Sequence, residues 1–188
     1  VGHHGGPVRV IAGAGSGKTR VLTQRMRHLL GDRGYRREAV IAVAYNKLAQ
    51  DELESRLSEL GPRTRTLNSL GYSLLNRHRG RVSPVLSEPE VRELINQVFP
   101  IPRNRRMNTD PVGPYLDALT VVRLALRSPA EVEDERDDVP GLADGFDEFR
   151  AQLAARGAVD FDEQIYGALE ALLRDAGWER PIYLHGAM

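Results

Sequence analysis

The sequence contains no cysteine, and only two of its 26 basic residues are lysine. Without cysteine the chain can form neither a disulfide nor a thiolate metal site, as is typical of the reducing cytoplasm. No apolar run approaches the roughly 18 residues that a membrane-spanning helix needs, so we expect a cytoplasmic chain without a membrane partner. The 188 residues, 41% of them hydrophobic, are sufficient for one to two domains with a buried core.

Charge is distributed unevenly, although the net charge of the chain is zero. Residues 1–80 carry 14 basic and 6 acidic side chains, whereas residues 81–188 carry 12 basic and 20 acidic ones. The first part therefore has a net charge of +8 and the second of −8. A basic half can contact the phosphates of a polynucleotide, but ordinary surface arginines would give the same charge.

One of the two lysines lies in a glycine-rich segment, residues 12–19, with the sequence AGAGSGKT. Small residues before a helix let successive backbone N–H groups point at one anion, and the helix N-terminus adds a positive dipole end. Lys18 would reach the β and γ phosphates of a nucleotide, and the Thr19 hydroxyl would bind Mg²⁺. The generic motif begins with glycine where this chain has alanine, and a simple turn between a strand and a helix remains the alternative. The expected nucleotide-binding residues are Ala12, Gly13, Ala14, Gly15, Ser16, Gly17, Lys18, Thr19 and Arg20, with Lys18 and Thr19 also as the catalytic candidates.

Apolar spacing predicts an α/β fold with a parallel sheet, and the glycine-rich segment between its first strand and helix assigns that fold to the P-loop type. Buried parallel strands are expected at residues 8–12, 40–45 and 63–67, with helices between them. The helix after the second strand should bury Leu53, Leu57 and Leu60 and end at Gly61-Pro62, and the next should begin at Ser69. From about Pro84 the spacing is purely helical, so residues 85–157 are expected to be an all-helical inserted subdomain. Its acidic run, residues 131–138, is expected to be solvated and mobile.

Two acidic residues near the end, Asp160 and Glu163, could be taken for a metal-binding carboxylate pair. Such a pair follows an apolar strand, and residues 155–158 do not form one, so we interpret the two residues as a helix capping box. The helix that follows should bury the apolar face formed by Phe161, Ile165, Leu169, Leu172 and Leu173.

Other functions of a phosphate-binding loop remain open. A small-molecule kinase would need a lid of arginines, which Arg103, Arg105 and Arg106 could supply. Guanine recognition by Asn46-Lys47 lacks its carboxylate, because position 49 is alanine. The signature of an ABC-type ATPase is absent. A module that binds DNA or a protein and hydrolyses nothing is the non-enzymatic alternative.

Four segments taken together resemble the UvrD/Rep-like superfamily 1 DNA helicases. They are the loop AGAGSGKT, the segment IAVAYNKLAQDELESRL at residues 41–57, TLNSLG at residues 66–71 and DFD at residues 160–162. The resemblance implies ATP-driven 3′-to-5′ movement along single-stranded DNA in repair or recombination, with ATP and Mg²⁺ as cofactors. It also implies a DNA-binding set composed of Tyr45, Asn46, Lys47, Thr66, Asn68 and Ser69.

The resemblance further implies a domain organisation. Residues 1–84 would be the first part of motor subdomain 1A, residues 85–157 the helical subdomain 1B, and residues 158–188 the return helix to 1A. The glutamine motif of the family and its Walker B carboxylates have no match here, since the apolar run 181–184 is followed by no carboxylate. We therefore expect a helicase fragment that binds ATP without hydrolysing it and whose partners are the remaining helicase domains.

Overall fold

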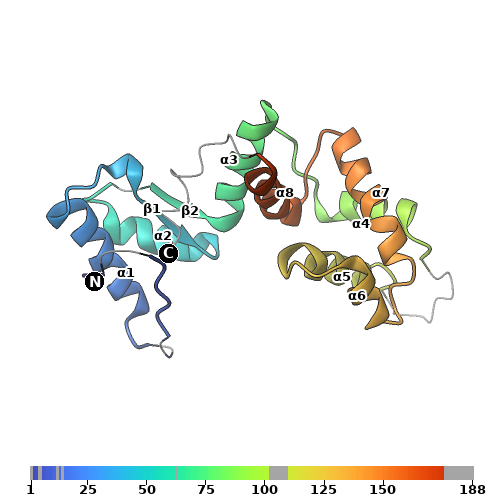
Figure 1. Cartoon of the computed structure of the whole chain (residues 1–188), viewed down its shortest axis with the longest axis horizontal. Helices are drawn as coiled ribbons and strands as arrows, with labels where there is room; N and C mark the ends of the chain where they lie inside the picture. Colours follow the sequence, from blue (N-terminus) through green and yellow to red (C-terminus); the bar gives the residue numbers. More distant parts are fainter. Residues whose placement is uncertain are drawn as a thin grey trace. The chain divides into compact units, whose positions relative to one another are not determined.

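The computed structural model describes residues 2–3, 6–11, 13, 15–61, 63–101 and 110–175. The chain forms two compact units, which Figure 1 shows in sequence colours. One comprises the residues up to Leu70 together with those from Leu172 on, and the other spans Gly71–Ala171. The division falls inside a helix, α3 (Leu67–Arg79), whereas the apolar spacing of the sequence changes near Pro84.

The first unit is built around two parallel strands, β1 (Ile41–Ala44) and β2 (Arg63–Thr66). Their register pairs Ile41 with Arg63 and Ala44 with Thr66. Parallel strands need a crossover connection, and α2 (Lys47–Leu57) supplies it. The strands predicted at residues 40–45 and 63–67 and the presence of the helix between them are thereby confirmed, although the helix ends at Leu57, before the predicted end at Gly61-Pro62. The other elements of this unit are α1 (Lys18–Arg27), a π-helical turn at His28–Asp32 and a 3₁₀ turn at Arg37–Ala39.

The core of the first unit lies between α1, α2 and β1, which pack together (Figure 1). Its buried side chains are Met26, Val40, Ala42, Ala44, Leu53 and Leu57. Because Leu53 and Leu57 are four residues apart, they share one face of α2, and Leu60 packs partly buried beside them. The predicted apolar face of this helix is confirmed.

Two predictions for the first unit are wrong. Residues 8–11, the described part of the expected first strand, form no strand, and Val8, Val10 and Ile11 are exposed. An apolar run becomes a strand only when a neighbouring strand accepts its hydrogen bonds, and β1 and β2 pair only with each other in the described sheet. Helix α3 begins two residues before Ser69, because the Thr66 hydroxyl already accepts from the Ser69 N–H at 3.1 Å.

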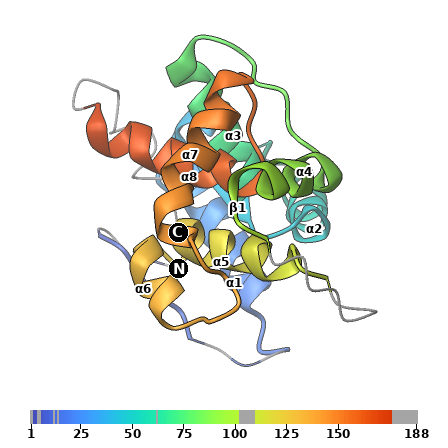
Figure 2. The same ribbon diagram turned by 90° about the vertical axis from the view of Figure 1, so that its right-hand side faces the viewer.

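The second unit is helical, as the apolar spacing of residues 85–157 predicts. Its core is formed by α4 (Glu88–Val98), α5 (Gly113–Leu124), α6 (Pro129–Asp134) and α7 (Leu142–Ala155), which Figure 2 shows from another side. The largest fully buried side chains include Tyr115, Phe149, Leu94, Ile95, Leu119, Leu142 and Leu153. One isolated parallel bridge, Val85 with Val159, joins the start of this region to its end.

The acidic run at residues 131–138 is exposed at five of its six acidic residues, which confirms the expectation of a solvated segment. It nevertheless forms regular structure, contrary to the expectation of a mobile segment. Its first part forms α6, whose capping box pairs Ser128 and Glu131 in both directions, at 3.1 and 3.2 Å. The Glu133 carboxylate accepts from the N–H groups of Gly141 and Ala143, at 2.6 and 2.7 Å. These donors belong to the N-terminal turn of α7, where negative charge is favourable.

Helix α8 (Phe161–Arg174) begins at the predicted cap but buries a different face. Asp160 accepts from the Glu163 N–H at 2.8 Å, which confirms the cap. The Glu163 carboxylate, which a full capping box would direct to the Asp160 N–H, accepts from Arg150 at 2.7 Å. The predicted buried face is wrong, because Phe161 and Leu173 are 65% and 69% exposed.

The buried face of α8 carries small residues instead, namely Gly167, Ala168 and Ala171. Small side chains allow α3 to approach closely. A Cβ on Gly71 of α3 would collide with the backbone carbonyl of Gln164, and one on Gly167 would lie 3.1 Å from Leu75 Cδ2. Close packing of two helices here outweighs the burial of the larger apolar side chains.

Candidate functional site

The glycine-rich loop adopts a backbone that its glycines permit. Gly15 and Gly17 have φ angles of +72° and +88°, where a side chain would be strained. The Gly13 carbonyl oxygen accepts from the Ser16 hydroxyl and from the Lys18 ammonium, each at 2.6 Å. The loop backbone therefore contacts the side chain of its own lysine. Ala12 and Ala14 lie outside the described residues.

Helix α1 presents its N-terminus to this loop. Gly17 is the N-cap residue, and in the described structure no side chain caps the helix and no acidic residue lies in its first turn. The first N–H groups of a helix have no partner within the helix, and they carry the positive end of its dipole. Arg20, exposed in the same turn, adds a full positive charge. This combination suits a phosphate group.

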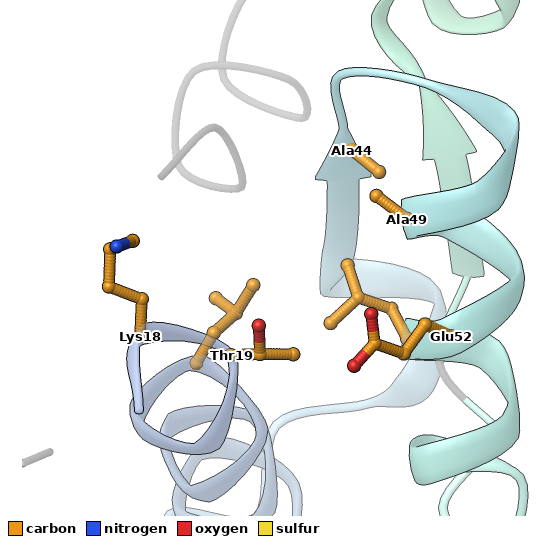
Figure 3. A pocket seen from close by; sticks show the side chains of 7 residues that line it. Lys18, Thr19, Ala44, Ala49 and Glu52 are labelled. Atoms are coloured by element: carbon orange, nitrogen blue, oxygen red, sulfur yellow. The ribbon is translucent and has the colours of Figure 1, made fainter. Parts of the chain in front are cut away.

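A cavity of about 190 Å³ lies between α1 and α2 (Figure 3). It is lined by Lys18, Thr19, Leu22, Ala44, Ala49, Glu52 and Leu53. Thr19 of α1 and Glu52 of α2 face each other across it, as Figure 3 shows. The Thr19 hydroxyl and the Glu52 carboxylate supply oxygen atoms, which Mg²⁺ binds together with those of phosphate and water. The residues present therefore fit the ion.

A second cavity, of about 230 Å³, opens beside the loop. It is lined by Gly15, Gly17, Lys18, Thr19, Arg20 and Arg56. Arg56 of α2 is also the ion-pair partner of Glu52, with 2.6 Å between its Nη2 and Glu52 Oε1. Three cationic side chains thus surround a cavity that the loop glycines border.

Sequence reasoning missed Glu52 and Arg56. The signal that could have found them is helical spacing, because residues 49, 52, 53 and 56 share one face of α2. Leu53 is buried in the core of the first unit and Ala49 is partly buried against it. Glu52 and Arg56 are half-exposed on the flank of that face, where they border the two cavities.

The predicted DNA-binding residues cluster at the carboxyl ends of the two strands. Since Ala44 pairs with Thr66, the residues that follow them, Tyr45 and Leu67, leave the sheet at the same edge. Tyr45 is 91% exposed, as a ring that stacks on a base must be. Ala44 lines the cavity at Lys18, so the exposed ring directly follows a cavity-lining residue in the sequence.

The polar members of that set have structural partners. Asn46 Oδ1 caps α2 by accepting from the Ala49 N–H at 2.8 Å. The Ser69 hydroxyl donates to the Thr66 carbonyl at 3.1 Å, and Asn68 is half-buried in the first turn of α3. Asp51 lies 2.8 Å from Lys47 and, through that hydrogen bond and its charge, raises the pKa of the ammonium.

Several sequence-based expectations fall on residues outside the described ranges. They concern Arg103, Arg105, Arg106 and the apolar run 181–184. Within the described ranges, no cluster of three acidic or histidine side chains could hold a metal ion. No helix there has the length and apolarity that crossing a membrane requires.

Comparison with known proteins gives one family. Residues 1–181 match the UvrD/REP helicase N-terminal domain. The chain is 27% identical over 175 residues to the ATP-dependent DNA helicase PcrA of Staphylococcus aureus, and 25% identical to that of Staphylococcus epidermidis. Each alignment covers 85% of this chain and 24% of the relative, so the chain spans about a quarter of these proteins.

Proposed function

This chain belongs to the UvrD/REP helicase N-terminal domain family, and we propose that it is the ATP-binding part of an ATP-dependent DNA helicase. The observation that carries the proposal is the pair of cavities at the start of α1, where Lys18 and Thr19 line both. A loop of glycines with left-handed backbone, an uncapped helix N-terminus and a lysine are the parts that a triphosphate site needs.

Each residue of the loop has a role in this proposal. Lys18 exchanges the Gly13 carbonyl for the β and γ phosphates, and the N–H groups after Gly17 bind the β phosphate. Thr19 is the residue that would ligate Mg²⁺, and Arg20 adds to the positive potential. When bound, Mg²⁺ neutralises part of the triphosphate charge.

The DNA-binding role belongs to the edge where β1 and β2 end. We propose that Tyr45 stacks on a base of single-stranded DNA, while Asn46, Lys47, Thr66, Asn68 and Ser69 surround its backbone. Stacking on an aromatic ring tolerates any sequence, as movement along a strand requires. By the family resemblance, that movement is 3′-to-5′ and serves repair or recombination. Residues 1–84 and 158–188 would then belong to subdomain 1A and residues 85–157 to 1B.

We further propose that these 188 residues bind ATP without turning it over. Phosphoryl transfer to water needs a group that orients the water and cations that stabilise the transition state, and an arginine finger alone accounts for about 10³ to 10⁵ in rate. Of the described residues that line the two cavities, Glu52 brings the sole carboxylate. The remaining helicase domains would supply the missing groups.

Titration calorimetry tests the proposed function. ATP with Mg²⁺ should bind weakly to the chain, and Lys18→Ala should abolish the heat of binding, because the ammonium is the charge nearest the phosphates. Arg27→Ala is the matched control. It removes one positive charge at the exposed last turn of α1, about 13 Å along the helix from Lys18. Equal binding by wild type and Lys18→Ala contradicts the proposal.

A further inference from the structure

We propose that Arg56 of α2 is a phosphate-binding residue of the nucleotide site, and that Glu52 holds its guanidinium beside the loop until a nucleotide arrives. This inference rests on the proposed function. It adds a cation that comes from α2, outside the glycine-rich segment and its helix.

The Arg56 side chain lines the same cavity as Gly15, Gly17 and Lys18. Those residues border the cavity from the loop and from α1, whereas Arg56 borders it from α2, which packs against α1. A phosphate in this cavity would therefore have cations on two sides.

A guanidinium binds phosphate differently from an ammonium. Lysine offers a compact point charge, whereas arginine offers a planar fork that matches two phosphate oxygens at once. Lys18 and Arg56 are thus complementary ligands for one triphosphate. With Arg20 they bring three positive charges to the cavity, which suits a ligand that carries several negative charges.

Arg56 and Glu52 form an ion pair at the i, i+4 spacing of α2. Arg56 Nη2 and Glu52 Oε1 are 2.6 Å apart, and the two side chains are 47% and 49% exposed. A half-exposed pair of this kind contributes little stability. It is strong enough to orient the guanidinium and weak enough for phosphate to replace the carboxylate.

The replacement has a consequence for Glu52 itself. Its carboxylate lines the neighbouring cavity opposite Thr19. When Arg56 binds phosphate, the carboxylate loses its partner at the place where the Thr19 hydroxyl would take up Mg²⁺. The pair therefore separates into one group for the phosphates and one group on the metal side.

Calorimetric titration of the 188-residue chain with ATP and Mg²⁺ tests the inference. Arg56→Ala should weaken binding about tenfold, the effect of losing one charge-assisted hydrogen-bonded contact. Arg56→Lys should recover part of that loss, since it keeps the charge and loses the fork. Arg27→Ala should bind as wild type does. Because Arg56 is half-exposed on a helix, alanine is compatible with folding there, and far-ultraviolet circular dichroism checks each variant.

A double-mutant cycle with Glu52→Gln tests the role of the ion pair. In titrations with ATP alone, which leave the metal side of the site out of the measurement, Glu52→Gln in the wild-type background should tighten ATP binding by about threefold or more, because the carboxylate no longer competes with phosphate for Arg56. In the Arg56→Ala background, the same change should have an effect of less than about twofold. Equal effects in the two backgrounds would show that Glu52 acts only through its charge and would overturn that part of the proposal.

A failed role of Arg56 and a failed nucleotide site give different results. If Lys18→Ala abolishes binding while Arg56→Ala binds as tightly as wild type, the nucleotide site stands and the role of Arg56 is wrong. If Lys18→Ala leaves binding unchanged, the proposed function itself is wrong.

Discussion

The absence of a side chain at Gly71 sets how closely α3 and α8 pack. Gly71 lies against the backbone of α8, where a Cβ would collide with the Gln164 carbonyl oxygen and lie 3.2 Å from Ile165 Cα. Backbone atoms cannot rotate away as a flexible side chain can. The helices would have to separate to admit even alanine.

We predict that Gly71→Ala lowers the free energy of unfolding by about 1 to 3 kcal/mol, the usual effect of overpacking. Gly31→Ala is the matched control, because Gly31 lies in the π-helical turn and a Cβ there would meet nothing within 4 Å. That control should leave the stability unchanged or raise it slightly. Urea titration followed by circular dichroism measures both. Equal midpoints for the two variants would refute the close approach.

Site residues differ in how far the sequence could predict them. Lys18 and Thr19 were predictable because their chemistry depends on neighbours in one short segment. Glu52 and Arg56 depend on which face of α2 meets α1, and that is decided by packing between segments more than 30 residues apart. The exposed ring of Tyr45 was placed at a strand end from the sequence, but the capping role of Asn46 depends on where α2 begins.

At the scale of elements, the start of α8 is fixed by one carboxylate with two functions. Asp160 caps the helix, and it also accepts two hydrogen bonds from Arg123 of α5, at 2.7 and 2.9 Å. This ion pair is buried, with the Arg123 and Asp160 side chains only 3% and 7% exposed. Asp162 lies 3.2 Å from the same guanidinium. Helix α8 is thereby tied to the helical core of the second unit.

Asp160→Asn should lower the free energy of unfolding by about 3 to 5 kcal/mol, because Arg123 would keep a buried charge without its main partner. Asparagine can still cap the helix, so the loss would report the charge. The comparison is Asp138→Asn, which breaks the exposed pair with Arg136 and should cost less than about 1 kcal/mol. Thermal unfolding monitored by circular dichroism ranks the two. Similar losses would mean that the Arg123 pair is not buried in solution.

Elements were predictable where pattern and partner lie close in sequence. The strands β1 and β2 and the helix α2 that connects them form one local unit, and the sequence indicates all three. The run at residues 8–11 has an equally apolar pattern, but a strand exists only with a neighbour to pair with. The face that α8 buries was also beyond the sequence, because Gly167 and Gly71 matter through the backbone that they admit.

At the scale of the whole molecule, the two compact units separate the proposed ligand site from most of the helical mass. Every residue that lines the two cavities belongs to the first unit, in its segment up to Leu70. The core of the second unit, from Val91 to Leu153, contributes none of them. The stability of the two units should therefore respond differently to nucleotide, since a ligand stabilises only the structure that binds it.

Hydrogen exchange with mass spectrometry measures that difference. Saturating ATP with Mg²⁺ should slow amide exchange in the glycine-rich loop, α1 and α2, and leave α4 to α7 unchanged. A short single-stranded oligonucleotide at low salt should protect residues 44–48 and 66–70, and Tyr45→Ala should remove that protection. Nucleotide-dependent protection within α5 or α7 would contradict the assignment of the nucleotide site to the first unit.

The hydrogen bond from Lys18 to the Gly13 carbonyl has a consequence for affinity. An exposed side-chain contact of this kind opens within nanoseconds, so it would not slow the entry of a nucleotide. A bound phosphate would exchange this 2.6 Å contact for a charge-assisted one. The free energy gained from the ammonium would therefore be the difference between two hydrogen bonds, and smaller than that of the phosphate contact alone.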